Sequence, residues 1–285
     1  MQTDYRSSYL RVRGHRTHYL EAGEGPPLVL IHGGGAGASG EHGFGRSIPA
    51  LARHFRVYAI DLLGCGLSDA PAIDYSVQQD VWHLAAFVER LCLEKVHLAG
   101  NSRGAEVAVK FALDFPERVA KVLMVASASV ARDMGIEIPM SEGRQALRRL
   151  HQELSVESMR AFMQTLIHDP SRISDELVES RVRVASRPGV IEANRASIAA
   201  VVRQAADPNL AQRADLRHRL PRLTIPLCLI WGREDRFAPL DLGYQLKERL
   251  PNLLEFHVFE RCGHQVQTEQ PERFAEVAIS FFQGG

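Results

Sequence analysis

LAGNSRGAEV, residues 98–107, is the most informative segment of the chain, because it joins an apolar run to a helical pattern through Gly-x-Ser-x-Gly. This pattern is typical of a sharp strand-to-helix turn that exposes a serine hydroxyl, here the hydroxyl of Ser102. Five residues of this kind also occur by chance in many chains. The interpretation therefore depends on the flanking segments and on a base and an acid elsewhere in the chain.

The segments around this turn alternate between short apolar runs and helical patterns. Strands are expected at 27–32, 55–61, 95–99, 119–126, 225–231 and 253–259, and helices at 76–92 and 103–115. Strands that alternate with helices predict a parallel sheet with right-handed crossovers. Ser102 thus falls between a strand and a helix, as a nucleophile turn requires.

The segment between the two groups of strands has a different composition. Residues 131–220 are rich in arginine, carry helical patterns and are interrupted by four prolines. We interpret residues 1–130 and 221–285 as one α/β core and residues 131–220 as a helical lid inserted into it. A separately folding second domain is the alternative.

Composition excludes several classes of function. Lys+Arg and Asp+Glu both number 34 in 285 residues, so the zero net charge argues against nucleic-acid binding and against attachment to a membrane surface. No apolar run approaches the roughly 18 residues of a membrane span, and MQTDYRSSYL at the start lacks the apolar core of a signal peptide. The four scattered cysteines are expected to be free thiols in the cytoplasm. No metal and no organic cofactor is expected.

A serine nucleophile needs a base to take its proton and an acid to orient that base. Asp235 and His264 each follow one of the late strands. Asp is also common in ordinary turns, and Glu234 is the rival acid, but the loop 236–239 that follows favours Asp235. His264 directly follows Gly263, and this favours a catalytic histidine over one of the surface histidines.

A glycine-rich turn supplies the fourth element of this chemistry. His32-Gly33-Gly34-Gly35 follows the first expected strand, and backbone N–H groups in such a turn can bind a developing oxyanion. The partner N–H group is expected to come from Arg103, the residue after Ser102. The Arg103 side chain is not needed for this role and is free to lie on the surface. A merely flexible loop is the alternative.

Four longer stretches make a family resemblance specific. The chain resembles the α/β-hydrolases along nearly its whole length, and within them the meta-cleavage product hydrolases, which cleave C–C bonds in aromatic degradation. The matching stretches are HGGGAGASG (32–40), GNSRGA (100–105), WGREDRFAPLD (231–241) and FERCGHQVQTEQPERF (259–274), with a looser match at 167–181.

This resemblance implies an activity and a set of site residues. Members of the family hydrolyse vinylogous 1,5-diketones after the dienol substrate is ketonised. By resemblance, Ser102, Asp235 and His264 are the triad, and the partner is a small molecule that carries a carboxylate. The resemblance likewise implies that Gly34 and Arg103 supply the oxyanion N–H groups. Relatives of this kind are often dimers or larger assemblies, so a homo-oligomer is expected.

The resemblance also assigns residues to the substrate. Asn101 and Arg181 match the polar residues that hold the dienoate end, and a guanidinium pairs well with a carboxylate. The alternatives are a solvated lid arginine and an asparagine that only shapes the turn. The further residues expected at the substrate are Gly33, Gly35, Leu166 and Gln265.

The chain departs from the family pattern at three places. Gln265 stands where the family usually has tryptophan, Glu41-His42-Gly43 where it has tryptophan and asparagine, and Ala105 where a second glycine is common. Gln265 predicts a more polar and roomier wall. Glu41 and His42 either line the mouth of the pocket or, as we favour, belong to a surface loop.

Three classes of function fit these residues. The first is a serine hydrolase acting on a C–C bond of a dienoate, and the second is a carboxylesterase or lactonase with the same triad. The third is a non-catalytic ligand-binding member of the fold, because fold does not fix function. Relatives with an aspartate nucleophile are disfavoured by Ser102.

Overall fold

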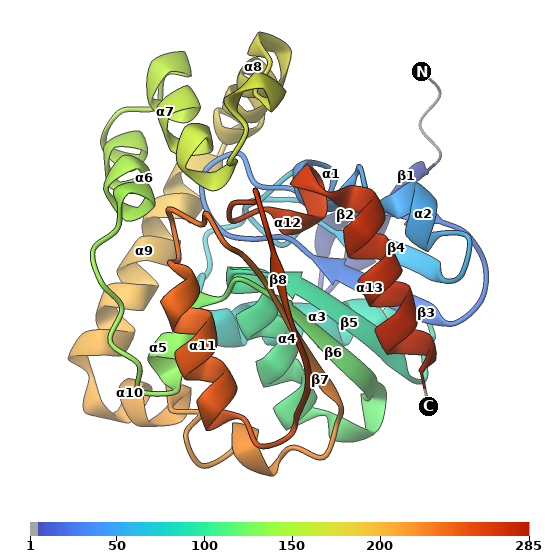
Figure 1. Cartoon of the computed structure of the whole chain (residues 1–285). Helices are drawn as coiled ribbons and strands as arrows, with labels where there is room; N and C mark the ends of the chain where they lie inside the picture. The colour runs from blue at the N-terminus through green and yellow to red at the C-terminus, as the bar shows by residue number, and fades with distance from the viewer. Residues whose placement is uncertain (1–4, 285) are drawn as a thin grey trace.

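The computed structural model describes residues 5–284, and an eight-stranded sheet runs through its centre (Figure 1). Residues 1–4, where the segment examined for a signal peptide begins, and residue 285 lie outside the described residues. The strands are β1 (Arg6–Val12), β2 (His15–Ala22), β3 (Pro27–Ile31), β4 (Arg56–Ile60), β5 (Val96–Asn101), β6 (Val119–Val125), β7 (Leu227–Gly232) and β8 (Leu253–Phe259).

The sheet is mostly parallel. Its spatial order is β1-β2-β4-β3-β5-β6-β7-β8, and only β2 runs against both of its neighbours. The carboxyl ends of β3, β5, β7 and β8 therefore meet at one edge, and the Gly-rich turn, Ser102, Asp235 and His264 all follow these ends. The parallel sheet predicted from the sequence is confirmed.

The hairpin formed by β1 and β2 is not among the predicted strands. Its turn is Arg13-Gly14, with φ of 50° and 85°, the left-handed pair that tight hairpins favour. β1 is an edge strand whose residues are mostly exposed or half-buried. It therefore lacks the continuous apolar run that reveals the central strands.

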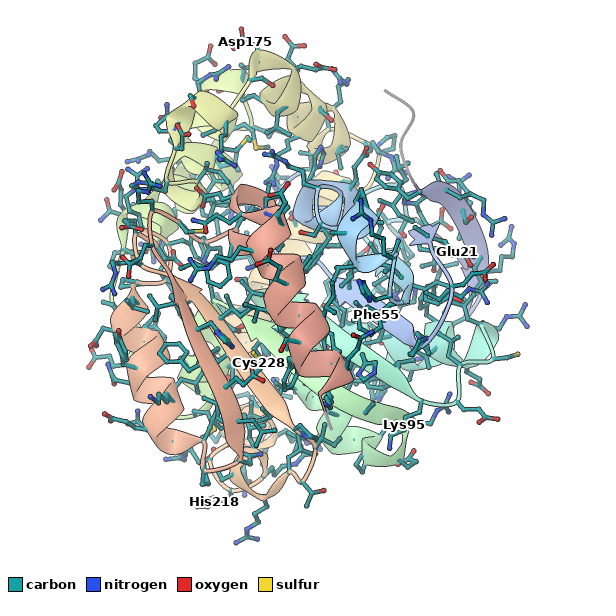
Figure 2. All side chains as sticks on the ribbon, turned by 45° about the vertical axis from the view of Figure 1, so that its right-hand side comes forward. Glu21, Phe55, Lys95, Asp175, His218 and Cys228 are labelled. Carbon is teal, nitrogen blue, oxygen red and sulfur yellow. The ribbon has the colours of Figure 1, made fainter. Side chains whose placement is uncertain are left out.

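Helices cover both faces of the sheet. The core helices are α1 (Gly40–Phe44), α2 (Ile48–Leu51), α3 (Val77–Arg90), α4 (Arg103–Asp114), α5 (Ala128–Asp133), α11 (Leu240–Arg249), α12 (Val266–Glu269) and α13 (Pro271–Gln283). α3, α4, α5 and α11 form one connected group, and α1, α2, α12 and α13 form another. On the second face, Phe55 packs edge-on against Phe282 of α13 at 5.9 Å (Figure 2).

Between β6 and β7, the described residues form helices and no strand. The helices are α6 (Glu142–Gln152), α7 (Val156–Leu166), α8 (Asp175–Ala185), α9 (Val190–Ala206) and α10 (Pro208–Ala214). α6, α7 and α8 stand above the carboxyl edge of the sheet (Figure 1). They share an apolar cluster that includes Met159, Phe162 and Val178 and is separate from the main core. Within residues 5–284, no helix has both the length and the apolar character to cross a bilayer.

Glycine at position 104 allows the serine turn to pack against β3. A Cβ built at Gly104 would lie 2.0 Å from the carbonyl oxygen of Ile31 and 2.6 Å from that of His32. No real Cβ approaches backbone this closely, so α4 would have to move away from the sheet. α4 and β3 are thus in direct contact at Gly104, two residues after Ser102.

We expect Gly104→Ala to destabilise the fold strongly. Overpacking in a core costs about 1–3 kcal/mol, and more where only backbone can yield. Gly14→Ala is the matched control, because its Cβ meets nothing within 4 Å and only its φ of +85° is unfavourable. Urea unfolding should show a clearly larger loss at position 104, and equal losses would contradict the close packing described here.

Candidate active site

Ser102 occupies a strained turn between β5 and α4. Its backbone has φ of 53° and ψ of −113°, a conformation that costs a non-glycine residue free energy and persists where its surroundings enforce it. The Ser127 hydroxyl donates to the Ser102 carbonyl at 2.8 Å, and the Ser102 N–H donates to the Val125 carbonyl at 2.8 Å. The turn places the serine at the carboxyl edge of the sheet.

His264 and Asp235 lie in direct contact. His264 Nδ1 is 2.7 Å from Asp235 Oδ2, and both side chains are buried. The other carboxylate oxygen accepts the N–H groups of Phe237 and Ala238 at 2.8 and 2.7 Å. A carboxylate held in this way keeps the histidine proton on Nδ1 and leaves Nε2 as the basic nitrogen.

The rival acid, Glu234, points elsewhere. Its Oε2 accepts the backbone N–H of Cys262 at 2.8 Å. Phe237, which the sequence analysis mentions only as part of the loop after Asp235, packs its ring 4.7 Å from the His264 ring. The histidine is thus held by a carboxylate at one nitrogen and packs against a tilted aromatic ring.

A narrow cavity of about 30 Å³ brings most of the expected site residues together. Of those residues, its walls include Gly33, Gly34, Asn101, Ser102, Leu166, Arg181, His264 and Gln265. Gly35 and Arg103 line a neighbouring cavity behind the glycine turn instead. Asp235 lies behind His264. The structure therefore gathers residues from loops at the sheet edge and from the helices between β6 and β7 around one serine.

The glycine turn faces the start of α4. A Cβ built at Gly34 would lie 3.4 Å from Arg103 Cδ and 3.5 Å from its Cβ, so the two backbone segments run side by side. The expectation that the Arg103 side chain is free to lie on the surface is wrong. It reaches inward, where Nη2 and Nε lie 2.6 and 2.8 Å from Asp80 Oδ2 and Nη2 also donates to the Tyr75 carbonyl at 2.8 Å.

We expect Asp80→Asn to cost about 3 kcal/mol of unfolding free energy, because breaking a buried ion pair leaves its partner charge unpaired. Arg103 opens α4, so the loss should also disturb the turn that carries Ser102. Asp74→Asn is the control, since Asp74 and Arg203 are half exposed and such pairs contribute little. Urea unfolding measures both; similar small losses would show that the buried pair does not hold α4.

Asn101 uses its amide nitrogen inside the protein. Nδ2 donates to the carbonyls of His264 and Val125 at 3.1 and 3.3 Å. Both N–H groups of the amide are therefore engaged by backbone. This favours the alternative in which Asn101 shapes the site by positioning the His264 backbone.

Arg181 is the unusual residue of the cavity. It lies on α8, is 4% exposed, and donates from Nη2 to Gln265 Oε1 at 3.2 Å. Its Nε has no hydrogen-bond partner, and no carboxylate in residues 5–284 forms an ion pair with it. Burial lowers the pKa of Arg181 to about 10, so the guanidinium stays charged at neutral pH. A buried cation without an anion is costly unless a ligand supplies one.

Glu41 and His42 do not form the surface loop that we favoured. They belong to α1, and His42 donates from Nδ1 to the Gly37 carbonyl at 3.0 Å while its Nε2 lies 3.1 Å from Ser180 Oγ. Burial, and then the nearby Arg181 charge, lower the pKa of His42 to about 4. A neutral His42 thus links α1 to α8 beside Arg181.

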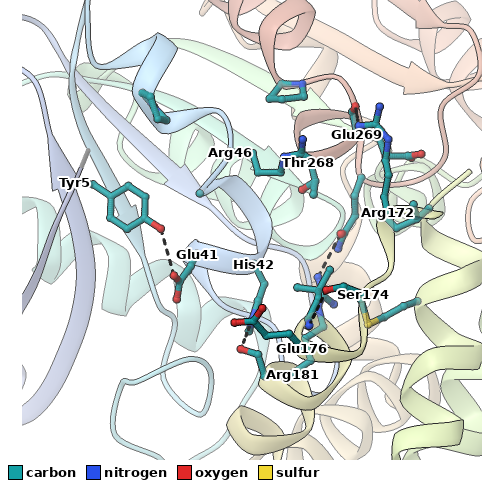
Figure 3. Close-up of a pocket in the computed structure, with 18 of the residues that line it drawn as sticks. Tyr5, Glu41, His42, Arg46, Arg172, Ser174, Glu176, Arg181, Thr268 and Glu269 are labelled. Carbon is teal, nitrogen blue, oxygen red and sulfur yellow. Dashed lines mark hydrogen bonds between the residues drawn. The ribbon is translucent and has the colours of Figure 1, made fainter. Parts of the chain in front are cut away.

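A second, larger cavity of about 590 Å³ adjoins the first. His42, Arg181 and Gln265 line both cavities and form the wall between them. In Figure 3, His42 and Arg181 lie on one side of this larger cavity, and the Tyr5 hydroxyl donates to Glu41 Oε1 at 3.2 Å on another. The residues that line both cavities are thus all polar.

Two close backbone approaches connect α7 and α8 to the site. The Leu166 carbonyl at the end of α7 accepts the His264 N–H at 2.8 Å. Gly37 has φ of +74°, and a Cβ there would lie 2.5 Å from the Arg181 carbonyl. Gly37 is not among the residues predicted from the sequence, although it lies within the glycine-rich segment 32–40. Glycine at this position lets α8 approach the glycine turn.

The described residues offer one group of possible metal donors. Cys228, Glu255 and His257 bring ligand atoms within 4.8 Å of one another on β7 and β8. None of the three lines the cavity around Ser102. A site without metal or organic cofactor remains a prediction from the sequence.

Comparison with known proteins identifies the class. A model of the alpha/beta hydrolase fold family matches residues 26–271, and the chain belongs to this family. Within it, the predicted resemblance to meta-cleavage product hydrolases is confirmed by relatives and by solved structures.

Two curated relatives are 2-hydroxy-6-oxononadienedioate/2-hydroxy-6-oxononatrienedioate hydrolases. The protein from Paraburkholderia phymatum is 36% identical over 93% of this chain and 90% of its own length. The protein from Burkholderia vietnamiensis is 34% identical, with the same shares covered.

Two solved structures show the same architecture. The meta-cleavage product hydrolase CumD from Pseudomonas fluorescens IP01, a mutant complexed with acetates, has a TM-score of 0.82 at 31% identity, covering 96% of this chain and 97% of its own. The 2-hydroxy-6-oxo-6-phenylhexa-2,4-dienoate hydrolase BphD from Rhodococcus sp. strain RHA1 has a TM-score of 0.85 at 26% identity, covering 98% and 99%.

Proposed function

We propose that this protein is a serine hydrolase that cleaves a C–C bond in a carboxylate-bearing meta-cleavage product, a dienoate formed by ring opening of an aromatic compound. The observation that carries this proposal is the buried Arg181, which faces the Ser102 cavity without an anionic partner. A substrate carboxylate would supply the missing charge. The names of the relatives support the same class of substrate.

In this proposal Ser102 is the nucleophile and His264 the base. The Ser102 hydroxyl attacks the carbonyl carbon of the ketonised substrate while its proton passes to His264 Nε2, and Asp235 holds the imidazole and balances its positive charge. The N–H groups of Gly34 and Arg103 stabilise the resulting oxyanion. The broken C–C bond leaves a carbanion that takes up a proton, and water then releases the acyl fragment as a carboxylic acid.

Arg181 acts as the anchor of the substrate. Its guanidinium binds the carboxylate of the dienoate. The carboxylate displaces Gln265 Oε1, which accepts a hydrogen bond from Arg181 Nη2 in this structure. Gly33 and Gly35 belong to the turn beside the reacting carbonyl, and Leu166 and Gln265 form part of the remaining wall. The two-pronged geometry of a guanidinium suits a carboxylate and fixes the distance from the anchor to Ser102.

Residues 131–220 act as a lid in this account, over a core of residues 1–130 and 221–285. The cavity at Ser102 measures about 30 Å³, space for about two water molecules. A dienoate with nine carbons needs several times this volume. The side chains of α7 and α8 must therefore shift when substrate enters. At the wall between the two cavities, formed by His42, Arg181 and Gln265, a movement of side chains is enough to make room for the substrate.

A carboxylesterase or lactonase is the second candidate, and one contact favours it. Gln265 Oε1 already accepts from Arg181, and a neutral ester would leave this contact intact. The triad chemistry is the same for both classes. A cytoplasmic location and a homo-oligomer remain predictions from the sequence.

Product analysis distinguishes the two candidates. The purified protein is incubated with 2-hydroxy-6-oxononadienedioate, and the products are followed by mass spectrometry. C–C hydrolysis yields two smaller acids whose masses sum to that of the substrate plus one water. An unchanged substrate, together with hydrolysis of a nitrophenyl ester, would replace the proposal by the ester-hydrolase alternative.

A further inference from the structure

A second Ser-His-Asp arrangement lies at the outer edge of the sheet. Ser7 Oγ on β1 is 2.8 Å from His18 Nε2 on β2, and His18 Nδ1 is 2.7 Å from Asp61 Oδ2, just after β4. The strand pairing produces this line, because β1 and β2 are antiparallel neighbours and β2 adjoins β4. Three residues from separate segments thus repeat the connectivity of a catalytic triad.

The contacts around Asp61 indicate which ring nitrogen of His18 carries the hydrogen. Asp61 Oδ1 accepts the Gly40 N–H at 2.6 Å, and Oδ2 accepts the Leu67 N–H at 2.7 Å. A carboxylate held by backbone donors beside Nδ1 keeps the imidazole proton there. The lone pair of His18 Nε2 is then directed at the Ser7 hydroxyl, which donates to it. Asp235 and His264 show the same arrangement, with two backbone N–H groups on the acid.

The hydroxyl is accessible while its partners are not. His18 and Asp61 are 3% and 1% exposed, whereas Ser7 is exposed on the edge strand. The Tyr9 ring covers the His18 ring at a centroid distance of 5.0 Å. A basic nitrogen shielded from water and aimed at an exposed hydroxyl is the condition that raises serine nucleophilicity.

This arrangement is separate from the candidate active site. Among the described residues that line the cavities on either side of Arg181, none is Ser7, His18 or Asp61. β1 is the strand at the far edge of the sheet from β7 and β8 (Figure 1). Reactivity at Ser7 would therefore be independent of substrate turnover at Ser102.

We propose that Ser7 is a second activated serine, a surface site that accepts acyl or phosphonyl groups from activated donors. Ser7 Oγ attacks the acyl carbon or phosphorus of the donor, its proton passes to His18 Nε2, and the leaving group departs with the bonding electron pair. The product is an ester at Ser7. Because Ser7 lies in an extended strand and lacks the strand-to-helix turn of Ser102, the adduct is released slowly and accumulates.

A fluorophosphonate tests this site on the Ser102→Ala protein, in which the candidate nucleophile is absent. Intact mass should show one adduct, formed with loss of fluoride, and peptide mapping should place it on Ser7. The adduct should disappear in Ser102→Ala/Ser7→Ala and persist in Ser102→Ala/Ser8→Ala. General-base assistance contributes about 10²–10⁴-fold, so labelling should be at least about 100-fold slower in urea.

Two results would overturn the proposal. One is the absence of any adduct on folded Ser102→Ala protein, and the other is an adduct that Ser7→Ala leaves in place. Ser7 is exposed, so its replacement by alanine is expected to leave the fold and dienoate turnover intact. Confirmation would mean that serine-directed labelling of the unmodified protein reports two sites, and that labelling alone does not identify Ser102.

Discussion

Ser102→Ala is expected to lower kcat for the dienoate by about 10⁴-fold or more, since a missing nucleophile leaves only binding and oxyanion stabilisation. The backbone of the turn is held by hydrogen bonds from the Ser127 hydroxyl and to the Val125 carbonyl, neither of which involves the Ser102 side chain. The variant should therefore fold and still bind substrate. Loss of the visible absorbance of the dienoate measures turnover, and calorimetric titration measures binding.

Ser280→Ala serves as the matched control, because Ser280 is an exposed serine on α13. It should retain the turnover of the unmodified protein. Undiminished turnover in Ser102→Ala would remove Ser102 from the mechanism. Loss of binding along with turnover would instead show that the serine turn needs its hydroxyl for structure.

Arg181→Ala is expected to lower kcat/KM for carboxylate-bearing dienoates by about 100-fold. Removing one partner of a desolvated charge pair costs a few kcal/mol, and about 2.7 kcal/mol corresponds to this factor. Neutral nitrophenyl esters should lose far less, because they place no anion at the guanidinium. The ratio of the two losses is the measurement.

Arg183→Ala is the control for this experiment. Arg183 lies on the same helix but is 66% exposed and 3.7 Å from Glu179, so both substrates should be unaffected. Equal losses on dienoate and ester in Arg181→Ala would show that Arg181 supports the lid and does not bind a carboxylate.

The same arginine carries a prediction about stability. Arg181 is buried without an ion-pair partner in residues 5–284, so its charge destabilises the folded state. Arg181→Met keeps a similar length and removes the charge, and we expect its unfolding free energy to equal or exceed that of the unmodified protein by about 1 kcal/mol. Urea unfolding without ligand measures this, and a large loss would mean that the charge has a partner in the fold.

The sequence analysis predicted the central sheet because its strands are buried on both faces. β3, β5 and β7 are nearly continuous apolar runs, and such runs stand out without knowledge of their neighbours. β1 was missed because it is a mostly exposed edge strand. β2 was missed because several of its buried positions carry polar side chains, among them Thr17, His18 and Glu21. The placement of His42 in a helix was not predicted for a similar reason. Its helix, α1, has only five residues and no apolar periodicity.

Contacts between side chains from distant segments were harder to predict than the strands. Arg103 meets Asp80 from α3, and Arg181 meets Gln265 across 84 positions of sequence. Each contact depends on how helices pack on the sheet, which local patterns do not encode. The positions of Ser102, Asp235 and His264 were predictable because each follows a strand end, and parallel strands bring such ends to one edge.

The central claim is that Ser102 acts on a dienoate anchored by its carboxylate. The most direct test is kcat/KM of the unmodified protein for 2-hydroxy-6-oxononadienedioate relative to kcat/KM for a short-chain nitrophenyl ester. We expect the dienoate to be the better substrate and both activities to disappear in Ser102→Ala. Turnover of the ester with no turnover of the dienoate would contradict it and would assign the site around Ser102 and Gln265 to ester or lactone hydrolysis.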